Sequence, residues 1–226
     1  ILPEEYGGAS ADPISFSVTV EEISKASASV GNILCVPVEI GDFIYLFGTE
    51  QQKEKYLKRI ANGEIIPAFA LTESGAGSDA GAIRMTARRE GNDYILNGRK
   101  VFITHATVCD LILVFARTGT QEMGSKGISA FLVDKNTPGL SVGKKEKILG
   151  IKGLGTAEVI FDDVRVPGDA MVGAENEGFK LAMKNIDTGR IAMASMALGI
   201  AQAALDAAVS YAKQREQFGK PIAQFQ

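Results

Sequence analysis

The hydrophobic residues of this 226-residue chain change their spacing twice, and this change limits the possible folds more than any other feature. Residues 13 to about 62 have the spacing of amphipathic helices. From about Ile66 to Pro167, short apolar runs alternate with turn residues, which is typical of strands. After Pro167 the helical spacing returns. This order predicts a multi-domain α+β protein with a β domain between two helical parts.

The N-terminal part predicts three helices. One apolar stripe with helical spacing consists of Phe16, Val20, Ile23 and Val30. A second, mostly apolar stretch covers residues 33–47. Thr49 and Gln52 have the spacing of a capping box, so we expect a third helix to begin there. Asn62-Gly63 is expected to end that helix, because glycine accepts the left-handed conformation that follows a helix.

The middle part predicts a β-sandwich or barrel of roughly one hundred residues. Its strand-like runs cover residues 94–96, 101–104, 111–115, 128–133 and 158–161. Asn97-Gly98 separates the first two runs and predicts a hairpin turn. No helical pattern alternates with the strands, which argues against a Rossmann sheet. The predicted domains are residues 1–65, the end of an N-terminal helical domain, 66–167, the middle β domain, and 168–226, the start of a C-terminal bundle.

The C-terminal part predicts about two helices, the first of them long. Its seven-residue repeat consists of Ile191, Leu198, Leu205 and Ala212. The 19 residues Ile191–Val209 are apolar enough to raise the question of a membrane span, but they include Asp206. An aspartate at the centre of a bilayer costs about 2.5–3.5 kcal/mol on insertion scales. We therefore expect no membrane contact and a helix buried in a bundle or at a subunit contact. Both helical parts look incomplete, which predicts an internal stretch of a longer protein.

Charge and composition exclude several kinds of partner. The 24 basic and 27 acidic side chains give a net charge of −3, which argues against nucleic acid as the main partner. Cys35 and Cys109 lie in apolar surroundings without a CxxC motif, so we expect two small core residues and a reducing compartment. The sequence contains a single histidine, His105, which excludes a centre with several histidine ligands. No metal site is predicted.

Residues 71–81 form the densest cluster of turn-forming residues. Gly75 and Gly77 could begin a dinucleotide-binding fingerprint, but the third glycine, Gly81, lies one place too far and no helical pattern follows. What remains is a loop of small residues with two hydroxyl groups, those of Thr72 and Ser78. Such a loop lets a phosphate or a flat ring approach the backbone closely. The residues alone fit a plain surface loop equally well.

Residues 70–79, ALTESGAGSD, resemble the signature of the acyl-CoA dehydrogenase family throughout. Further segments resemble the family in the same order along the chain: PEEYGG at 3–8, FGTEQQKEKYL at 47–57, NGRKVFIT at 97–104, VIFDDVRVP at 159–167, GFKLAM at 178–183 and QREQFGKPIAQFQ at 214–226. The resemblance covers essentially the whole chain. It implies the family fold, which is a helical domain, a central antiparallel β-sandwich or barrel and a helical bundle. It also implies FAD as the cofactor.

The resemblance implies two walls around the flavin. Phe69 to Thr72 would line it on one side, with Thr72 bonded to the ring edge, and Phe102 stands where many relatives have tryptophan. The implied cofactor-binding residues are Phe69, Leu71, Thr72, Gly77, Ser78, Phe102, Ile103, Thr104, Arg215, Phe218 and Gln226. Arg215 and Gln226 would reach the FAD of a neighbouring subunit. The resemblance therefore implies a homotetramer built as a dimer of dimers.

The resemblance also implies an acyl-CoA site. Its residues are Ser78, Asp187, Gly189 and Arg190. Asp187 to Arg190 would form a turn at a helix start, where aspartate is a good N-cap. Arg190 would oppose the helix dipole in the first turn, so binding CoA would be the reason for its presence. Glu73 is expected to be structural, because it can accept backbone hydrogen bonds in its loop.

The implied reaction is α,β-dehydrogenation, in which a glutamate takes the C2 proton and flavin N5 takes the C3 hydride. In most of the family that glutamate lies in a downstream Tyr-Glu-Gly segment, which is absent from these 226 residues. In a subset it occupies the position of Gly189. No residue of this sequence is therefore assigned as the base, which we expect beyond Gln226. Electrons would pass to an electron-transfer flavoprotein.

Three alternatives stay open: a flavin monooxygenase or oxidase of the same fold, an enoyl-CoA reductase running the reaction in reverse, and a non-catalytic CoA- or flavin-binding relative. Arg190 favours CoA chemistry. The bulky segment Ile40–Phe47 would favour a short acyl group if it lines the pocket. The expected location is the cytoplasm in a bacterium or the mitochondrial matrix in a eukaryote.

Overall fold

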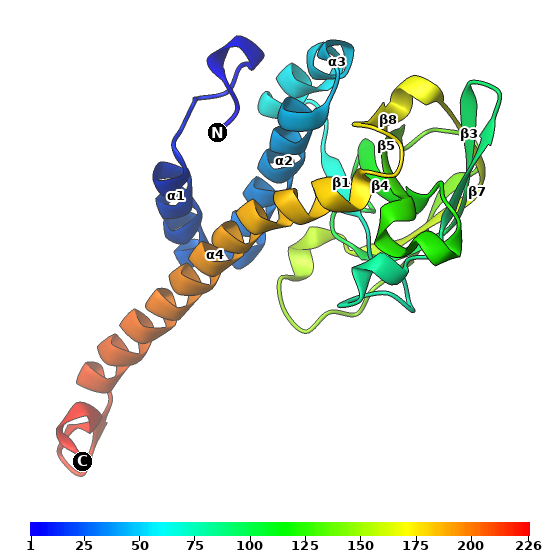
Figure 1. Cartoon of the computed structure of the whole chain (residues 1–226). Coiled ribbons are helices and arrows are strands. Elements are labelled where there is room, and N and C mark those ends of the chain that lie inside the picture. The colour runs from blue at the N-terminus through cyan, green and yellow to red at the C-terminus, as the bar shows by residue number, and fades with distance from the viewer.

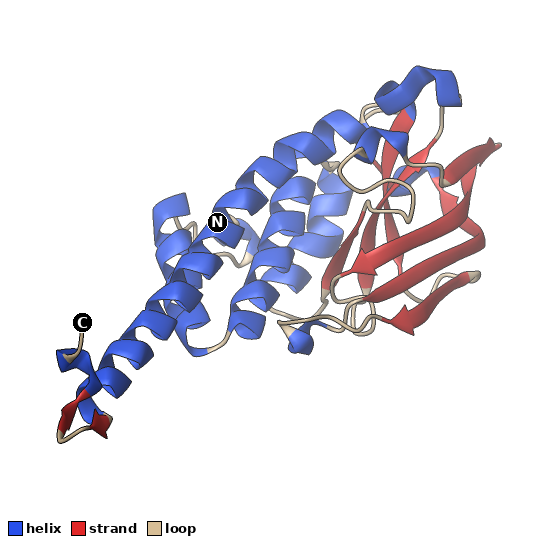
Figure 2. Ribbon diagram, turned by 90° about the horizontal axis from the view of Figure 1, so that it is seen from below, coloured by secondary structure: helices blue, strands red, loops and turns tan.

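The computed structural model describes all 226 residues, and along the chain a β domain separates two helical parts. In space the C-terminal helix packs beside the N-terminal helices, and the β domain lies to one side of them (Figure 1, Figure 2). The helices are α1 (Pro13–Ala26), α2 (Ala28–Phe47), α3 (Glu50–Ala61) and α4 (Gly178–Gln214). The main sheet contains β1 (Pro67–Ala70), β2 (Thr86–Glu90), β3 (Asp93–Ile103), β4 (Leu111–Arg117), β5 (Ile128–Asp134), β6 (Leu140–Lys145), β7 (Ala157–Pro167) and β8 (Met171–Val172). A small hairpin of β9 (Glu216–Gln217) and β10 (Lys220–Pro221) follows α4. The predicted α+β fold is confirmed.

Side-chain caps fix the ends of the N-terminal helices. The Thr49 hydroxyl accepts the backbone N–H of Gln52 at 3.2 Å, and the Gln52 side-chain oxygen accepts the N–H of Thr49 at 3.0 Å. The predicted capping box is therefore confirmed. The Gln52 amide also donates to the carbonyl oxygens of Asp169 and Met171, at 2.8 and 2.9 Å. One buried side chain thus begins α3 and ties it to the β domain.

The eight strands form one sheet in the order β6-β7-β3-β2-β4-β5-β8, and β1 pairs in parallel with β4. β2 pairs along its whole length with β3 but meets β4 at a single register pair, Thr86 with Arg117. The sheet bends at this short contact, so that β3 and β7 face β4 and β5. Side chains from both halves then meet in one core of 19 buried residues, among them Leu96, Val114, Phe131 and Val159.

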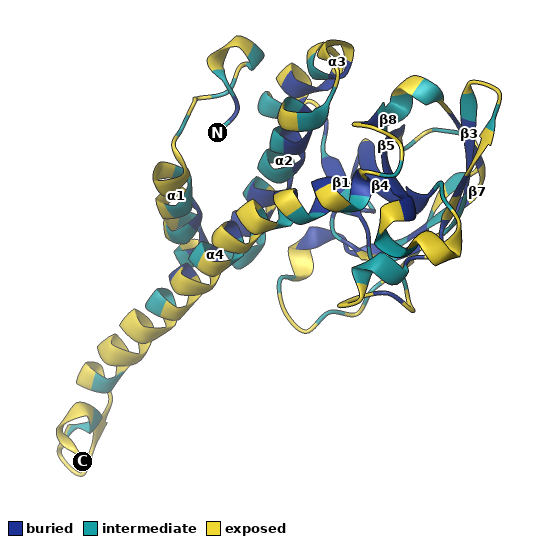
Figure 3. Ribbon diagram, in the orientation of Figure 1, coloured by how far each residue is buried: buried dark blue, intermediate teal, exposed yellow.

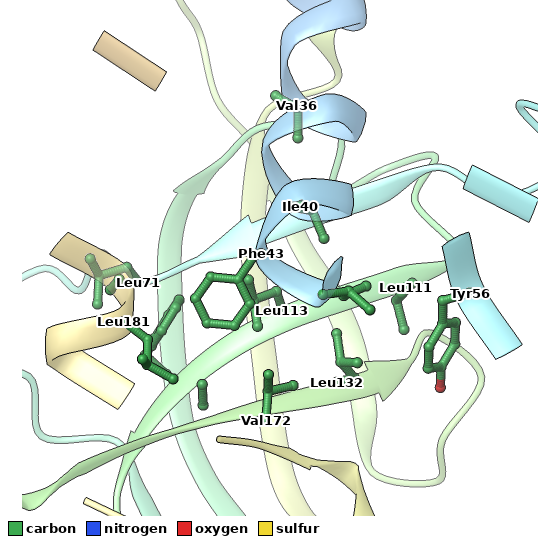
Figure 4. Packing of buried hydrophobic residues seen from close by; sticks show 14 of the residues in the cluster. Val36, Ile40, Phe43, Tyr56, Leu71, Leu111, Leu113, Leu132, Val172 and Leu181 are labelled. Atoms are coloured by element: carbon green, nitrogen blue, oxygen red, sulfur yellow. The ribbon is translucent and has the colours of Figure 1, made fainter. Parts of the chain in front are cut away.

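β4 and β5 are buried on both faces. Alternate side chains of a strand point to opposite faces, so Leu113 and Phe115 reach the helices while Ile112 and Val114 reach the core inside the β domain. On the helical side, Phe43 of α2 lies over the sheet beside Leu113 (Figure 4). Phe43 also packs edge-on against Phe115, with ring centroids 5.9 Å apart. The two cores thus share β4 and β5 as a common wall.

The prediction of a hairpin turn at Asn97-Gly98 is wrong. Both residues lie inside β3, at an irregularity in its pairing with β7. Gly98 has φ +148°, and a Cβ there would lie 2.8 Å from the Met85 side chain. The Asn97 side chain bonds to Asp163 of β7 twice, at 2.8 and 2.9 Å. A bulge and a tight turn both need residues that accept unusual backbone angles, so this dipeptide fits either.

The C-terminal part contains one helix instead of the expected two, and Asp187 to Arg190 lie inside it. Asp187 therefore caps nothing, and Arg190 is not in a first turn. Both expectations about a helix start were wrong. A glycine inside a helix costs only about 1 kcal/mol relative to alanine, which the packing of the long helix offsets.

The first part of α4 is covered on one face, and after Gly199 the helix has no buried residue (Figure 3). Ala192, Met196 and Gly199 are buried, whereas Ile191, Leu198, Leu205 and Val209 are exposed. By length and composition alone α2 and α4 could each cross a membrane, but 44% of the most apolar window of α2 is buried and only 17% of that of α4. A position inside a bundle, one of the two expectations for this helix, is therefore not found within this chain, because α1 and α2 reach one side of α4 only. The other expectation, a subunit contact, stays a prediction.

We expect Phe43→Ala to lower the free energy of unfolding by about 3–5 kcal/mol, because it opens a cavity where α2 meets the sheet. Phe43 has no exposed surface, whereas Leu46 on the same helix is 64% exposed. Leu46→Ala is the matched control and should change stability by less than about 1 kcal/mol. Urea titration followed by circular dichroism measures both. Equal losses in the two variants would contradict the proposed packing.

Candidate functional site

A cleft of about 420 Å³ lies between the β domain and the helices. Its strand wall consists of Phe69, Thr72, Phe102, Ile103 and Thr104. Its helix wall consists of Asn32, Val36, Glu39, Ile186, Gly189, Arg190 and Met193. The structure thus brings together seven of the residues that the sequence singled out, from segments more than one hundred residues apart.

The strand wall offers aromatic surface beside polar groups. Phe102 lies near the end of β3 with φ +59° and is 61% exposed. A positive φ is uncommon for an aromatic residue, and such backbone geometry is frequent at binding sites. Phe69 is half-buried and packs against Phe115 at a centroid distance of 5.1 Å. Thr72 and Thr104 add hydroxyl groups.

These residues fit a flat ring system with polar edges, as FAD would present. Exposed aromatic surface can stack on such a ring, and hydroxyl groups can bond to its edges. Across the cleft, the side-chain oxygen of Asn32 is buried without a hydrogen-bond partner. A buried acceptor without a partner costs free energy, so a ligand that donates to it is favoured.

The signature loop that leads into the cleft rests on a buried ion pair. Glu73 accepts the backbone N–H groups of Arg84 and Met85 at 2.7 and 3.0 Å, and the Lys100 ammonium at 2.8 Å. The expectation that Glu73 is structural is therefore confirmed. Lys100 has no exposed surface and also donates to the carbonyl oxygen of Leu71 at 2.9 Å. Burial lowers the pKa of Lys100 to about 8, although Glu73 opposes this shift.

Leu71 turns its side chain away from the cleft, into the core beneath the helices (Figure 4). Any contact of Leu71 with a cofactor must therefore come from its backbone. Residues Ile40, Phe43 and Ile44 also belong to this core and do not line the cleft. The segment Ile40–Phe47 was expected to favour a short acyl group only if it lined the pocket. Because it does not line the cleft, it gives no reason to expect a short acyl group.

Ser78 lies outside the cleft, in a second hollow that Phe179 and Met183 of α4 also line. Gly77 is exposed on the same loop. The two hollows follow one stripe of α4, made by Phe179, Met183, Ile186, Arg190 and Met193. At 1.5 Å per residue this stripe is roughly 21 Å long. An elongated ligand could therefore extend from the Ser78 loop into the cleft.

Arg215, Phe218 and Gln226 lie at the far end of α4 and are exposed (Figure 1). Phe218 is 94% exposed and packs only edge-on against Phe225, at a centroid distance of 6.1 Å. These residues do not join the cleft of their own chain. Their role toward a neighbouring subunit stays a prediction.

Sequence reasoning missed three polar residues. Asn32 and Glu39 interrupt a mostly apolar helix at i and i+7, so they share one face of α2. That spacing was a usable signal for a polar feature on this wall. Lys100 gave no signal, because a lysine in an alternating strand usually points to solvent.

This chain belongs to the acyl-CoA dehydrogenase family. Family models match its residues 1–64 as the N-terminal domain, 68–164 as the middle domain and 176–226 as the C-terminal domain. An acyl-CoA dehydrogenase of Bacillus subtilis is 52% identical over 98% of this chain, and a 3-(aryl)acrylate reductase of Clostridium sporogenes is 52% identical over 100% of this chain. These matches cover 59% and 60% of the two proteins, so the chain spans well under two thirds of their length.

Solved structures give the same result. A chain in a structure of the electron transferring flavoprotein of Acidaminococcus fermentans has a TM-score of 0.96 and 49% identity, over 99% of this chain and 59% of that one. Butyryl-CoA dehydrogenase from Megasphaera elsdenii has a TM-score of 0.96 and 44% identity, over 99% of this chain and 60% of that one. The predicted family and fold are confirmed.

We expect Lys100→Met to lower the free energy of unfolding by about 3–5 kcal/mol, because it leaves the buried Glu73 carboxylate without its cation. The double variant Lys100→Met, Glu73→Gln should lose less than the sum of its two single variants, since the second change removes the charge left unpaired. Chemical unfolding of all four proteins measures this coupling. Additive losses would show that the pair is not coupled.

Proposed function

We propose that the protein that contains this chain is an FAD-dependent acyl-CoA dehydrogenase, which removes hydrogen from C2 and C3 of an acyl-CoA thioester. One observation carries the proposal: the cleft combines an aromatic and hydroxyl-bearing strand wall with a helix wall that presents Arg190. Family membership and the likeness to butyryl-CoA dehydrogenase support it. FAD, when bound, accepts the hydride that leaves C3.

The strand wall would hold the flavin ring. Phe69 and Phe102 supply apolar surface that excludes water, and Phe102 has no indole N–H, so its contact with the ring is purely apolar. The hydroxyl groups of Thr72 and Thr104 would bond to polar atoms at the ring edge. The backbone of Leu71 is fixed by the hydrogen bond from Lys100, which keeps this wall in one position.

The substrate would follow the stripe along α4. Ser78 and Arg190 would bind the CoA part, one from the signature loop and one from the helix. Arg190 pairs with Asp187 at 2.6 Å, and both side chains are about 70% exposed. Such an exposed pair contributes little to stability, so Arg190 can turn toward an anionic group at small cost while Asp187 keeps it nearby. The proposal assigns the C2 proton to a glutamate outside these 226 residues.

The partners in this proposal are an electron-transfer flavoprotein and further copies of the same chain. The structure of electron transferring flavoprotein from Acidaminococcus fermentans supports the first of these. The exposed apolar side chains of α4 and the exposed Arg215 support a homotetramer with shared FAD sites. A location in the cytoplasm or the mitochondrial matrix belongs to the same proposal.

A second candidate is the reverse reaction, in which the protein reduces an enoyl-CoA. The relative from Clostridium sporogenes is named a reductase and is as similar to this chain as the dehydrogenase from Bacillus subtilis. The two directions use the same cleft, so the redox partner decides between them.

The test is an anaerobic titration of the flavin-loaded protein with butyryl-CoA, followed by its visible absorbance. A dehydrogenase loses flavin absorbance as the acyl-CoA is added. A protein whose chemically reduced flavin is reoxidised by crotonyl-CoA, but which butyryl-CoA does not bleach, works in the reductive direction. A protein that retains FAD and responds to no acyl-CoA or enoyl-CoA refutes both candidates.

We expect Arg190→Ala to raise the Kd for acyl-CoA about tenfold, which corresponds to roughly 1.4 kcal/mol. FAD content should stay unchanged, because Arg190 contacts the substrate in this proposal. Lys184→Ala removes an exposed cation from the same helix outside the cleft lining and is the matched control. Calorimetry gives the Kd, and the absorbance ratio of flavin to protein gives the FAD content. An unchanged Kd in Arg190→Ala would exclude the CoA role.

A further inference from the structure

The helix wall of the cleft carries a carboxyl group that the proposed reaction does not use. Glu39 lies on α2, is half-buried and lines the cleft together with Val36. Its one hydrogen bond is long, from the Asn185 amide to Oε1 at 3.4 Å. None of the ion pairs of the chain includes Glu39. Most of its hydrogen-bonding capacity is therefore free for a ligand.

Gly189 makes the space for this carboxyl. A Cβ at residue 189 would lie 3.1 Å from Oε1 and 3.4 Å from Oε2 of Glu39. The carboxyl thus lies directly against the backbone of α4, where any other residue at 189 would crowd it. Two helices meet here so that a carboxyl from α2 faces the cleft and no side chain from α4 covers it.

A second polar group lies on the same face of α2. Asn32 precedes Glu39 by seven residues, which is roughly 10.5 Å along the helix. Asn32 is 8% exposed, its side-chain oxygen has no partner, and its nitrogen contacts only the Met193 sulfur at 3.6 Å. The side chains of Val36, Ile186 and Met193 beside these two groups are apolar. A pure hydrocarbon that fills the cleft would strip water from the Glu39 carboxyl and offer neither polar group a hydrogen bond.

The Glu39 carboxyl can be protonated or ionised near neutral pH, because burial changes its pKa. Burial raises the pKa of the Glu39 carboxyl to about 7. Cys35, one turn earlier on α2, has a pKa raised to about 11 by burial and stays neutral. From α4, Arg190 lines the same cleft and pairs with Asp187 outside it. The strand wall contributes no titratable side chain. A hydroxyl group suits both states of Glu39, because it can donate to the carboxylate and accept from the protonated acid.

We infer that Glu39 selects acyl thioesters whose acyl group carries a hydroxyl over those with a purely hydrocarbon chain. The inference rests on the proposed function, since it concerns the acyl group that the cleft accepts. The hydroxyl replaces the water that Glu39 loses when the ligand enters. A methyl group at the same place leaves the carboxyl without a partner, and this penalty grows as Glu39 ionises.

The test compares binding of acyl-CoA pairs that differ only in a terminal methyl or hydroxyl group, at three chain lengths. Sulfur in place of C3 prevents loss of hydrogen from that position, so the Kd is measured without reaction. Calorimetry uses the flavin-loaded protein that contains this chain. We expect the hydroxyl form to bind about tenfold more tightly at one length or more, since a hydrogen bond to a charged group is worth this much.

The variants separate charge from shape. Glu39→Leu should bind the methyl form more tightly, and Glu39→Gln should retain part of the hydroxyl preference. Glu54→Gln changes an exposed glutamate on α3 and is the matched control, with an unchanged preference. An amine-ended ligand forms the third arm. Tighter binding of the amine than of the hydroxyl would overturn the choice of a neutral group.

The pH dependence of the Kd distinguishes a binding role of Glu39 from a purely structural one, because a structural role predicts no such dependence. The folded-state pKa of Glu39 is raised from 4.5 to about 7, so its carboxyl ionises as the pH rises from 6 to 8. Binding of the methyl form by the unmodified protein should weaken over this range, and Glu39→Gln should remove that dependence. An equal preference in the unmodified protein and Glu39→Leu at all three lengths refutes the inference. If butyryl-CoA still bleaches the flavin, the proposed function survives that result; if no acyl-CoA binds or bleaches, the proposed function itself fails.

Discussion

The burial of β4 and β5 on both faces is the constraint on which the rest of the molecule depends. Their alternate side chains complete two separate cores, one with the helices and one inside the β domain. Neither core could close without the other, because the same two strands form a wall of each. The cleft lies at the rim of this shared wall, where β1 and β3 end and α2 and α4 cross them. Its lining includes Val36 from the core with the helices and Ile103 from the core inside the β domain.

The buried ammonium group of Lys100 holds the signature loop, residues 70–79, in place. Lys100 reaches from β3 to the Leu71 carbonyl and to Glu73, and Glu73 in turn holds the backbone at Arg84 and Met85. Such a network is costly to bury and costly to break. In return it fixes the backbone on which Thr72 presents its hydroxyl. The loop is exposed at Gly77 and Ser78, but its base is held by these buried hydrogen bonds.

Much of this arrangement was predictable from local chemistry. The capping box at Thr49 needs only its own residues, and the strands at 111–115 and 128–133 are apolar on both faces. The bulge at Gly98 was mistaken for a turn, because its reason is the Met85 side chain in another strand. The continuation of α4 through Asp187 depends on tertiary packing that overrides a weak start signal. Glu39 could not be predicted as a cleft residue, because its position there depends on how α2 packs against α4.

The length of α4 has a consequence for where its last residues can act. From Arg190 to Arg215 a helix rises roughly 37 Å at 1.5 Å per residue. That is far beyond the reach of an arginine side chain, and a continuous helix cannot fold back to shorten it. The helix therefore fixes the separation of the backbone at Arg190 and at Arg215. The two arginines of one chain cannot contact the same small group of a ligand. Arg215 therefore cannot line the cleft that Arg190 of the same chain lines.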